Sequence, residues 1–169
     1  MNIPVNYKNL LLNAAIVFLP LSVAAQKKLP DVMVRSLDGK SEKIKSYTEN
    51  NPLTIISFWA TWCSPCKREL DAMVELYPQW KEKYQIELLA ISTDNPRQLA
   101  KVRPMVAAQG WPYVILTDAN AELKNALNFQ AIPHTLIVDK NGNIVYEHTG
   151  YLPGDEAELE KKIAALSGK

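Results

Sequence analysis

The sequence contains few of the residues that bind transition metals, with only two cysteines and two histidines among 169 residues. A closed structural zinc site takes four ligands, usually cysteine and histidine. His134 and His148 lie far along the chain from Cys63 and Cys66, and their spacing is not that of a zinc finger. The composition therefore argues against a zinc finger. It leaves open a structural or copper site formed by both cysteines and one histidine.

The chain also lacks an excess of either charge, with 19 Lys and Arg against 18 Asp and Glu and a formal net charge of +1. Lys8 is the only charged residue among the first 25, so the remainder of the chain is formally neutral. A neutral chain has no general electrostatic attraction to nucleic acid or to an anionic membrane surface. We therefore expect no nucleic-acid partner. The sequence contains no internal repeat, and its length predicts one domain.

The first 25 residues have the pattern of a secretory signal peptide. One positive charge precedes a mostly apolar run over residues 9–21, and Val-Ala-Ala at 23–25 provides the small residues that signal peptidase requires. The apolar run is short for a membrane span of about 20 residues, and Pro20 interrupts it. We predict cleavage after Ala25.

Cleavage after Ala25 would leave a domain of residues 26–169 in the periplasm or another extracytoplasmic compartment, where disulfides persist. The alternative is an uncleaved N-terminal anchor, which is the only form of membrane contact that we expect. No cysteine lies near the cleavage site, and this excludes a lipoprotein anchor.

Strand patterns alternate with helix patterns beyond residue 30. Apolar runs that are typical of strands buried on both faces, and shorter strand patterns, occupy residues 53–59, 86–91, 113–116, 135–138 and 143–148. Helix patterns begin at residue 63 and cover 95–109, 120–127 and 155–166. Asp-Gly at 38–39 and Asn-Gly at 141–142 predict hairpins near the two ends of the domain. This order predicts an α/β fold with a mixed sheet flanked by helices.

Three local predictions concern helix ends and loops. Pro78 should kink or end the helix that begins at Cys63. Pro104 would lie inside the next helix, where proline is unfavourable because it removes a backbone hydrogen bond. Asp155 and Glu158 have the spacing of an N-terminal cap for the last helix. Residues 47–52 are predicted to form a loop.

Cys63 and Cys66 lie two residues apart in the segment WATWCSPCKRE, residues 59–69, between a predicted buried strand and a predicted helix. The first cysteine would then lie at a helix N-terminus, where free N–H groups and the helix dipole favour a thiolate, the nucleophilic form. Pro65 suits an early helical position because its missing N–H would be unpaired anyway. Cys66 lies one turn further on, placed to attack a mixed disulfide on Cys63.

Exchange of electrons with another protein is therefore the favoured role of the cysteine pair. A purely structural disulfide between Cys63 and Cys66 would close too small a loop to constrain the unfolded chain much. A peroxiredoxin is disfavoured, because the Pro and Thr expected ahead of a peroxidatic cysteine are not at that spacing.

The segment WATWCSPCKRE resembles the WAxWCxPCxxE active site of thioredoxin-fold proteins, and specifically of the extracytoplasmic TlpA/ResA-like thiol–disulfide oxidoreductases. The resemblance covers about residues 30–166 and includes Ile132-Pro133 directly before a strand. It implies a thioredoxin-like fold with an N-terminal β-hairpin and a central αβ insertion. It also implies a redox-active disulfide between Cys63 and Cys66, with no bound metal or cofactor.

The resemblance further implies a substrate-binding face around the cysteines. Pro133 is expected to be a cis proline that faces the cysteine pair, with the backbone of Ile132 pairing with the substrate chain. Trp62, Ser64 and Pro65 are expected to belong to the same face. Trp59 can shape this face or simply pack in the core.

Glu69 is the third expected catalytic residue, because it lies three residues after Cys66 and can move the proton of that thiol. Thioredoxin has a buried Asp on the central strand where this sequence has Ser57, so Glu69 has no obvious competitor. The alternative is an acid that only interacts with the helix dipole, a stabilisation of about 0.3–1 kcal/mol. Two further departures are Asp71, where many relatives have Pro, and His134, which can tune the thiols or simply pack.

Proteins of this family mostly reduce disulfides, often in cytochrome c maturation or thiol repair, and receive electrons from an upstream donor. The resemblance thus predicts a reductant whose partners are thiol- or disulfide-bearing proteins, such as apocytochrome c. The alternatives are a disulfide-forming oxidant and a metal-carrying chaperone on the same fold. Ser64-Pro65 resembles the reducing members more than the oxidising ones.

Overall fold

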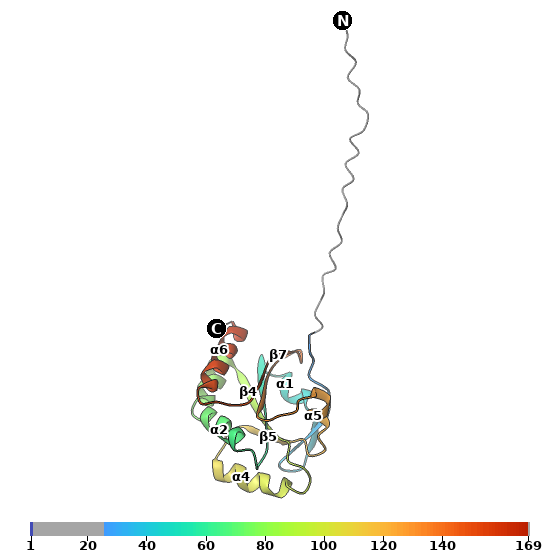
Figure 1. The fold of residues 1–169 in the computed structure, drawn as a ribbon, viewed down its shortest axis with the longest axis vertical. Helices are drawn as coiled ribbons and strands as arrows, with labels where there is room; N and C mark the ends of the chain where they lie inside the picture. Colours follow the sequence, from blue (N-terminus) through green and yellow to red (C-terminus); the bar gives the residue numbers. More distant parts are fainter. Residues whose placement is uncertain (2–25, 169) are drawn as a thin grey trace.

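The computed structural model describes residue 1 and residues 26–168, so the predicted signal peptide lies outside the described residues. The fold is a single sheet with strand order β2-β1-β5-β4-β3-β6-β7 (Figure 1). The β3–β4 and β4–β5 pairs are parallel, and the other neighbouring strands are antiparallel. This arrangement confirms the mixed α/β sheet and the N-terminal hairpin.

The strands lie close to where the sequence predicts them. Their bounds are β1 Met33–Ser36, β2 Ser41–Lys43, β3 Leu53–Trp59, β4 Ile86–Ser92, β5 Val114–Thr117, β6 His134–Asp139 and β7 Ile144–Thr149. Every residue of the central strand β3 is buried, which explains its nearly continuous apolar sequence.

The helices cover both faces of the sheet. Their bounds are α1 Lys45–Thr48, α2 Ser64–Met73, α3 Tyr77–Tyr84, α4 Val102–Gln109, α5 Glu122–Leu127 and α6 Asp155–Ser167, with a short 3₁₀ helix at Leu99–Lys101. Helices α2 and α6 lie on one side of the sheet, and α1 and α5 lie on the other (Figure 1). Within the described residues, no helix is long and apolar enough to cross a bilayer.

The prolines end and begin helices rather than bending them. Helix α2 ends at Met73, and Pro78 lies in the first turn of α3, where its missing N–H costs no hydrogen bond. The helix predicted from residue 95 starts only at Leu99, as a 3₁₀ turn. Pro104 consequently lies in the first turn of α4 and is not an interior residue.

Two other local predictions are wrong. Asp155 and Glu158 do not form a capping box, because Gly154 is the N-cap of α6 and no side chain caps it. Instead, Asp155 accepts a hydrogen bond from Leu152 N at 2.7 Å, and Glu158 pairs with a lysine on α6. Part of the predicted loop at 47–52 belongs to the one-turn helix α1.

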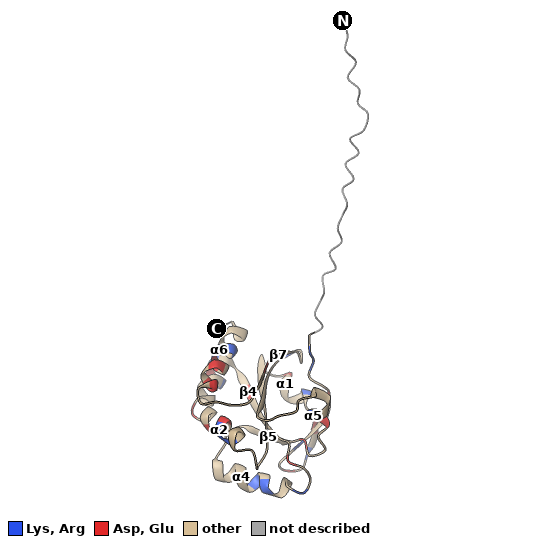
Figure 2. Ribbon diagram, viewed as in Figure 1, with Lys and Arg blue, Asp and Glu red and all other residues tan. Residues whose placement is uncertain are grey.

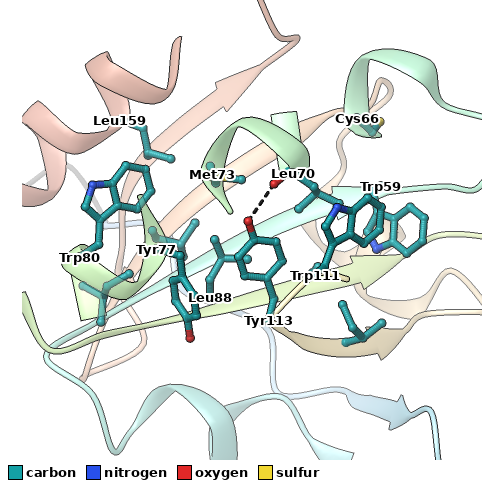
Figure 3. Packing of buried hydrophobic residues seen from close by; sticks show 14 of the residues in the cluster. Trp59, Cys66, Leu70, Met73, Tyr77, Trp80, Leu88, Trp111, Tyr113 and Leu159 are labelled. Atoms are coloured by element: carbon teal, nitrogen blue, oxygen red, sulfur yellow. Dashed lines mark hydrogen bonds between the residues drawn. The ribbon is translucent and has the colours of Figure 1, made fainter. Parts of the chain in front are cut away.

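Aromatic side chains fix α2 to the sheet and to the insertion that precedes β5. Tyr113 donates a hydrogen bond to Leu70 O at 2.8 Å (Figure 3). Trp111 Nε1 donates to Asp71 Oδ1 at 2.7 Å. The rings of Trp59 and Trp111 meet edge to face, with centroids 4.8 Å apart. Asp71 thus anchors the insertion to the helix that carries Cys66.

The segment that precedes the sheet lies along its β7 edge. Ile144 N donates to Lys27 O and Leu29 N donates to Gly142 O, both at 2.8 Å. Lys27 also forms an ion pair with Glu147 of β7 at 2.9 Å. Residues 27–29 therefore pack against the start of an edge strand.

Candidate active site

Cys63 and Cys66 form a disulfide at the N-terminus of α2, with their Cα atoms 5.4 Å apart. Cys63 is the N-cap residue, and its Sγ accepts a hydrogen bond from Cys66 N at 3.3 Å. Pro65 lies in the first turn of the helix, as the sequence predicts. After reduction, the same N–H group and the helix dipole would stabilise a thiolate on Cys63.

The two cysteines differ less in exposure than the sequence suggests. Cys66 is fully buried, and Cys63 retains only 4% of its possible exposure. The neighbouring residues Trp62 and Ser64 are exposed, Trp62 to 62%. Trp59 is fully buried and packs on Trp111, so it belongs to the core. A partner would therefore meet the rim formed by Trp62 and Ser64 before it meets the sulfur atom of Cys63.

The loop before β6 lies beside the disulfide. The Ile132–Pro133 peptide bond is cis, as the resemblance implies, and Pro133 is buried. Cys63 Sγ lies 3.9 Å from Ile132 O, and Gly150 N donates to Pro133 O at 2.8 Å. The fold thus brings together two segments that lie 69 residues apart in the chain.

Glu69 is a buried residue of α2, with 5% exposure, and its carboxylate faces the sheet. Its Oε2 accepts a hydrogen bond from Ser57 Oγ and its Oε1 accepts one from Thr135 Oγ1, both at 2.8 Å. Burial raises the pKa of Glu69, and the two hydroxyl donors oppose that shift. Glu69 is therefore not a solvent-facing acid at a helix start. The sequence contains a signal for Ser57, since it is one of only two polar residues, with Thr54, in the mostly apolar run at residues 53–59.

A second buried carboxylate, which the sequence analysis missed, holds the loop in front of the cysteines. Asp94 is fully buried and accepts hydrogen bonds from Thr61 N at 2.8 Å and from Thr61 Oγ1 at 2.7 Å. It also accepts one from Ser92 Oγ at 2.8 Å. Thr61 lies two residues before Cys63, so Asp94 fixes the approach to the active-site helix. The available signal was its position three residues after the end of the strand predicted at 86–91.

Replacement of Asp94 with alanine should lower the free energy of unfolding by about 2–4 kcal/mol, because it leaves buried donors of Thr61 and Ser92 unpaired. Denaturant titration of the oxidised wild-type and Asp94→Ala proteins measures the difference. Asp94→Asn, which keeps an acceptor oxygen, should lose less. Equal midpoints for the alanine variant and the wild type would contradict this account of the loop.

His134 faces away from the cysteines. It belongs to the opposite face of the sheet, where its ring stacks on Phe129 with centroids 4.3 Å apart. Its Nδ1 lies 2.8 Å from Thr149 Oγ1, and its Nε2 lies 3.2 Å from Glu147 Oε1. Burial lowers the pKa of His134, although Glu147 opposes that shift. These contacts agree with the packing role. In residues 26–168, no group of three Cys, His, Asp or Glu side chains is arranged to hold a metal ion.

The sequence matches the model of the AhpC/TSA family over residues 25–147. It is 31% identical, over 137 residues, to the thiol-disulfide oxidoreductase ResA of Geobacillus kaustophilus, an alignment that covers 81% of this chain and 76% of that protein. ResA of Geobacillus thermodenitrificans is 30% identical over 80% of this chain and 75% of its own length.

Solved structures share the fold. A thioredoxin-like protein from Porphyromonas gingivalis is 42% identical, with a TM-score of 0.73, and the match covers 83% of this chain and 92% of that one. A putative thiol:disulfide interchange protein DsbE from Chlorobium tepidum has a TM-score of 0.74 at 22% identity, over 84% of this chain and 96% of that one. The second similarity concerns the fold alone.

Proposed function

The chain belongs to the AhpC/TSA family and is a ResA-like thiol–disulfide oxidoreductase, and we propose that it works outside the cytoplasm as a reductant of disulfides in partner proteins. The observation that carries the proposal is the Cys63–Cys66 disulfide at a helix N-terminus, 3.9 Å from the carbonyl of Ile132. This arrangement provides one stabilised sulfur, one buried sulfur and a backbone group for a partner chain.

The proposed cycle begins with the reduced protein. The Cys63 thiolate attacks a partner disulfide, forms a mixed disulfide and releases one partner sulfur as a thiolate. Cys66 then loses its proton and attacks Cys63 Sγ. The Cys63–Cys66 disulfide forms, and the second partner sulfur leaves. Two electrons pass from the protein dithiol to the partner disulfide, and an upstream donor must return them.

Glu69 is the proposed acceptor of the Cys66 proton. Both residues lie on α2 three positions apart, on one face of the helix. Ser57 and Thr135 hold the carboxylate, and burial brings its pKa closer to neutral pH, where a general base is most effective. In this protein Ser57 orients the base rather than acting as one.

Trp62, Ser64, Pro65, Ile132 and Pro133 form the proposed substrate-binding face. Trp62 and Ser64 are exposed beside Cys63, and Ile132 is half-buried next to its sulfur. The carbonyl of Ile132 can accept a hydrogen bond from an extended partner chain. The partners are proposed to be proteins with exposed thiols or disulfides, and apocytochrome c is one candidate.

The extracytoplasmic location rests on the signal-peptide pattern of residues 1–25 and on a cysteine pair suited to a compartment where disulfides persist. The proposed mature domain is 26–169. Mass spectrometry of the protein from a cell envelope fraction tests both, because it should find Gln26 at the N-terminus. Intact Met1 in a membrane fraction would support the anchored alternative.

The direction of electron flow is tested by the reduction potential. Known proteins of this type range from about −270 mV for thioredoxin to about −120 mV for a strong periplasmic oxidant. Equilibration of the cysteine pair with thiol buffers of known potential should give a value nearer to the thioredoxin limit. A value near the oxidant limit would support a disulfide-forming enzyme. Metal analysis of the purified protein separately tests the metal-carrying chaperone, which requires stoichiometric metal.

Replacement of Trp62 with alanine should weaken the interaction with protein substrates more than it weakens folding. Trp62 is the large exposed aromatic side chain next to Cys63, and such side chains often dominate interfaces. We expect KM for a disulfide-bonded protein substrate to rise about tenfold, equivalent to about 1.4 kcal/mol. The melting temperature and the rate with a small disulfide should change little.

Leu166→Ala is the matched control for Trp62→Ala. Leu166 is also an exposed large hydrophobic residue, but it lies near Leu53, at the end of β3 away from the cysteines. It should leave KM unchanged. Equal effects of the two variants on KM would remove Trp62 from the substrate-binding face.

A further inference from the structure

A row of polar side chains crosses one face of the sheet from Glu69 to the β7 edge. Ser57 of β3 lies opposite Thr135 of β6, and Thr135 lies opposite His148 of β7. Side chains directly opposite each other on neighbouring strands project from the same face. Ser57 and Thr135 donate to the carboxylate of Glu69, so His148 is the next polar side chain in the row that holds it.

The row ends in apolar side chains in the other direction. The partner of Ser57 in β4 is Ala90, and the next strand places Ile115 beside Ala90. Both belong to the buried core. Polar side chains that could accept a proton from Glu69 therefore lie toward β7, whereas the side chains toward β5 are apolar.

A small cavity connects Glu69 with His148. Its volume is about 10 Å³, roughly the space that one water molecule requires. Glu69, Thr135, His148 and Asp155 are among the residues that line it. A water molecule there would have the several polar partners that buried water needs.

The outer end of the row reaches solvent. His148 Nε2 lies 3.5 Å from Asp155 Oδ2, and the two side chains are 40% and 33% exposed. Asp155 belongs to the first turn of α6, which also contains Glu156 and Glu158 (Figure 2). Asp155 is thus the acidic neighbour of His148 at the solvent end of the row.

We propose that His148, supported by Asp155, carries the proton between Glu69 and solvent. The proposal rests on the proposed role of Glu69 as the base for Cys66. Histidine suits this task because its neutral ring can accept a proton at one nitrogen and release it near neutral pH. His148 acts through Glu69 and does not touch the sulfur atoms, so it is a positioning residue for the proton.

The proton is conserved along the route. Cys66 transfers it to the Glu69 carboxylate as the thiolate attacks the mixed disulfide. The neutral carboxyl group then gives the proton to His148 through the cavity, and the imidazolium releases it to bulk water. When the disulfide is reduced again, the same groups return one proton to Cys66.

The charged and titratable groups that line the cavity beside Glu69 come from three elements. His148 and Tyr146 belong to β7, Tyr151 belongs to the following loop, and Asp155 and Glu156 belong to α6. His148 lowers the pKa of Glu69, whereas Asp155 raises it. Tyr151 donates to Glu156 at 3.0 Å. His148 is thus the basic side chain among the residues that line the cavity.

The test is the rate at which Cys66 resolves a mixed disulfide on Cys63, measured by stopped flow from pH 5 to 9. His148→Ala should slow this step about tenfold near neutral pH, less than the loss of the general base itself, because water can still accept the proton from Glu69. Added imidazole should restore most of the rate, because it can occupy the role of the missing ring. Asp155→Asn should slow the step less. Glu158→Gln, which removes a carboxylate paired with Lys161 on α6, should leave the rate unchanged.

The same measurement on Glu69→Gln tests the role of Glu69 as the base separately from the role of His148 in the proton route. Slow resolution in Glu69→Gln with a normal rate in His148→Ala would overturn the route and retain Glu69 as the base. Normal rates in both variants would overturn both proposals. A slow His148→Ala that imidazole does not restore would show a structural role for His148 and would also overturn the route.

Discussion

Replacement of Cys63 with serine should reduce the rate of disulfide exchange by roughly 10³-fold or more, since it removes the attacking sulfur itself. A serine hydroxyl at the helix N-terminus is not ionised near neutral pH and cannot replace a thiolate. Reduction of a disulfide-bonded model protein, with a chemical reductant as electron source, measures the loss. Folding should be retained, because serine is a good N-cap residue.

Cys66→Ala should have a different effect from Cys63→Ser. The first attack remains possible, so a mixed disulfide with the partner should accumulate and multiple turnover should stop. Non-reducing electrophoresis detects that adduct in the purified system, and the same variant in cells should capture the physiological partners. Thiol-dependent adducts on Cys63→Ser, but not on Cys66→Ala, would reverse the assignment of the two cysteines.

Brief alkylation of the reduced protein near neutral pH provides an independent check of the same assignment. Cys63 should carry the label, because its sulfur lies at the helix N-terminus and Cys66 is fully buried. The 4% exposure of Cys63 predicts slow labelling by bulky reagents and faster labelling by small ones. Labelling mainly at Cys66 would contradict the proposed mechanism.

Replacement of Glu69 with glutamine should slow resolution of the mixed disulfide by about 10²-fold near neutral pH, the lower limit usually found for a positioned general base. Glutamine retains a side-chain oxygen that can accept from Ser57 or Thr135, so most of the packing should remain. The first attack by Cys63 should change little. Single-turnover kinetics with a chromophoric disulfide separates the two steps.

The pH profiles should differ in a specific way. In the wild type, the rate of resolution should fall as pH falls through the raised pKa of Glu69, because a protonated carboxyl group cannot accept the Cys66 proton. In Glu69→Gln, the rate should rise with pH until Cys66 ionises unaided. The two rates should converge at high pH. Superimposable profiles would remove Glu69 from the mechanism.

Glu69 should give the stability of the wild type a pH dependence that Glu69→Gln lacks. Burial raises the pKa of folded Glu69 above its ordinary value of 4.5, so its contribution to stability is complete below pH 4.5. That contribution decreases as pH rises through the folded-state pKa. Glu69→Gln has no such decrease. The melting temperature of the variant relative to the wild type should therefore rise with pH above 4.5.

The strands and the redox motif were predictable because their signals are local. The run at residues 53–59 is apolar on both faces, and the cysteine pair follows it directly, so strand, helix N-terminus and chemistry can all be inferred from one segment. The approximate place of the second half of the site, at residues 132–133, depended on resemblance. No local property of Ile-Pro predicts a contact across 69 positions in the chain.

The buried polar groups were harder to predict. Asp94 bonds to Thr61, 33 residues away, and the distance between them depends on the parallel pairing of β3 with β4. The set around Glu69 was missed for the same reason. Thr135 and His148 lie near Glu69 only because β6 and β7 follow β3 in the sheet. Contacts of this kind follow from strand order and register, which composition and periodicity do not specify.

The β7 edge of the sheet is covered at its start, and this limits how another chain can pair with it. An open edge strand offers a continuous series of N–H and C=O groups to any extended peptide, and this promotes aggregation. Lys27 O pairs with Ile144 N, the first N–H group of that series, and Leu29 N pairs with Gly142 O in the turn before β7. At the far edge, β2 is a short strand of exposed Ser, Glu and Lys. The proposed pairing site for an incoming chain, the loop at Ile132, lies beside the disulfide and away from both edges of the sheet. Because few backbone groups at the two edges of the sheet are free to pair, the protein should favour partner chains that carry a disulfide over any exposed strand.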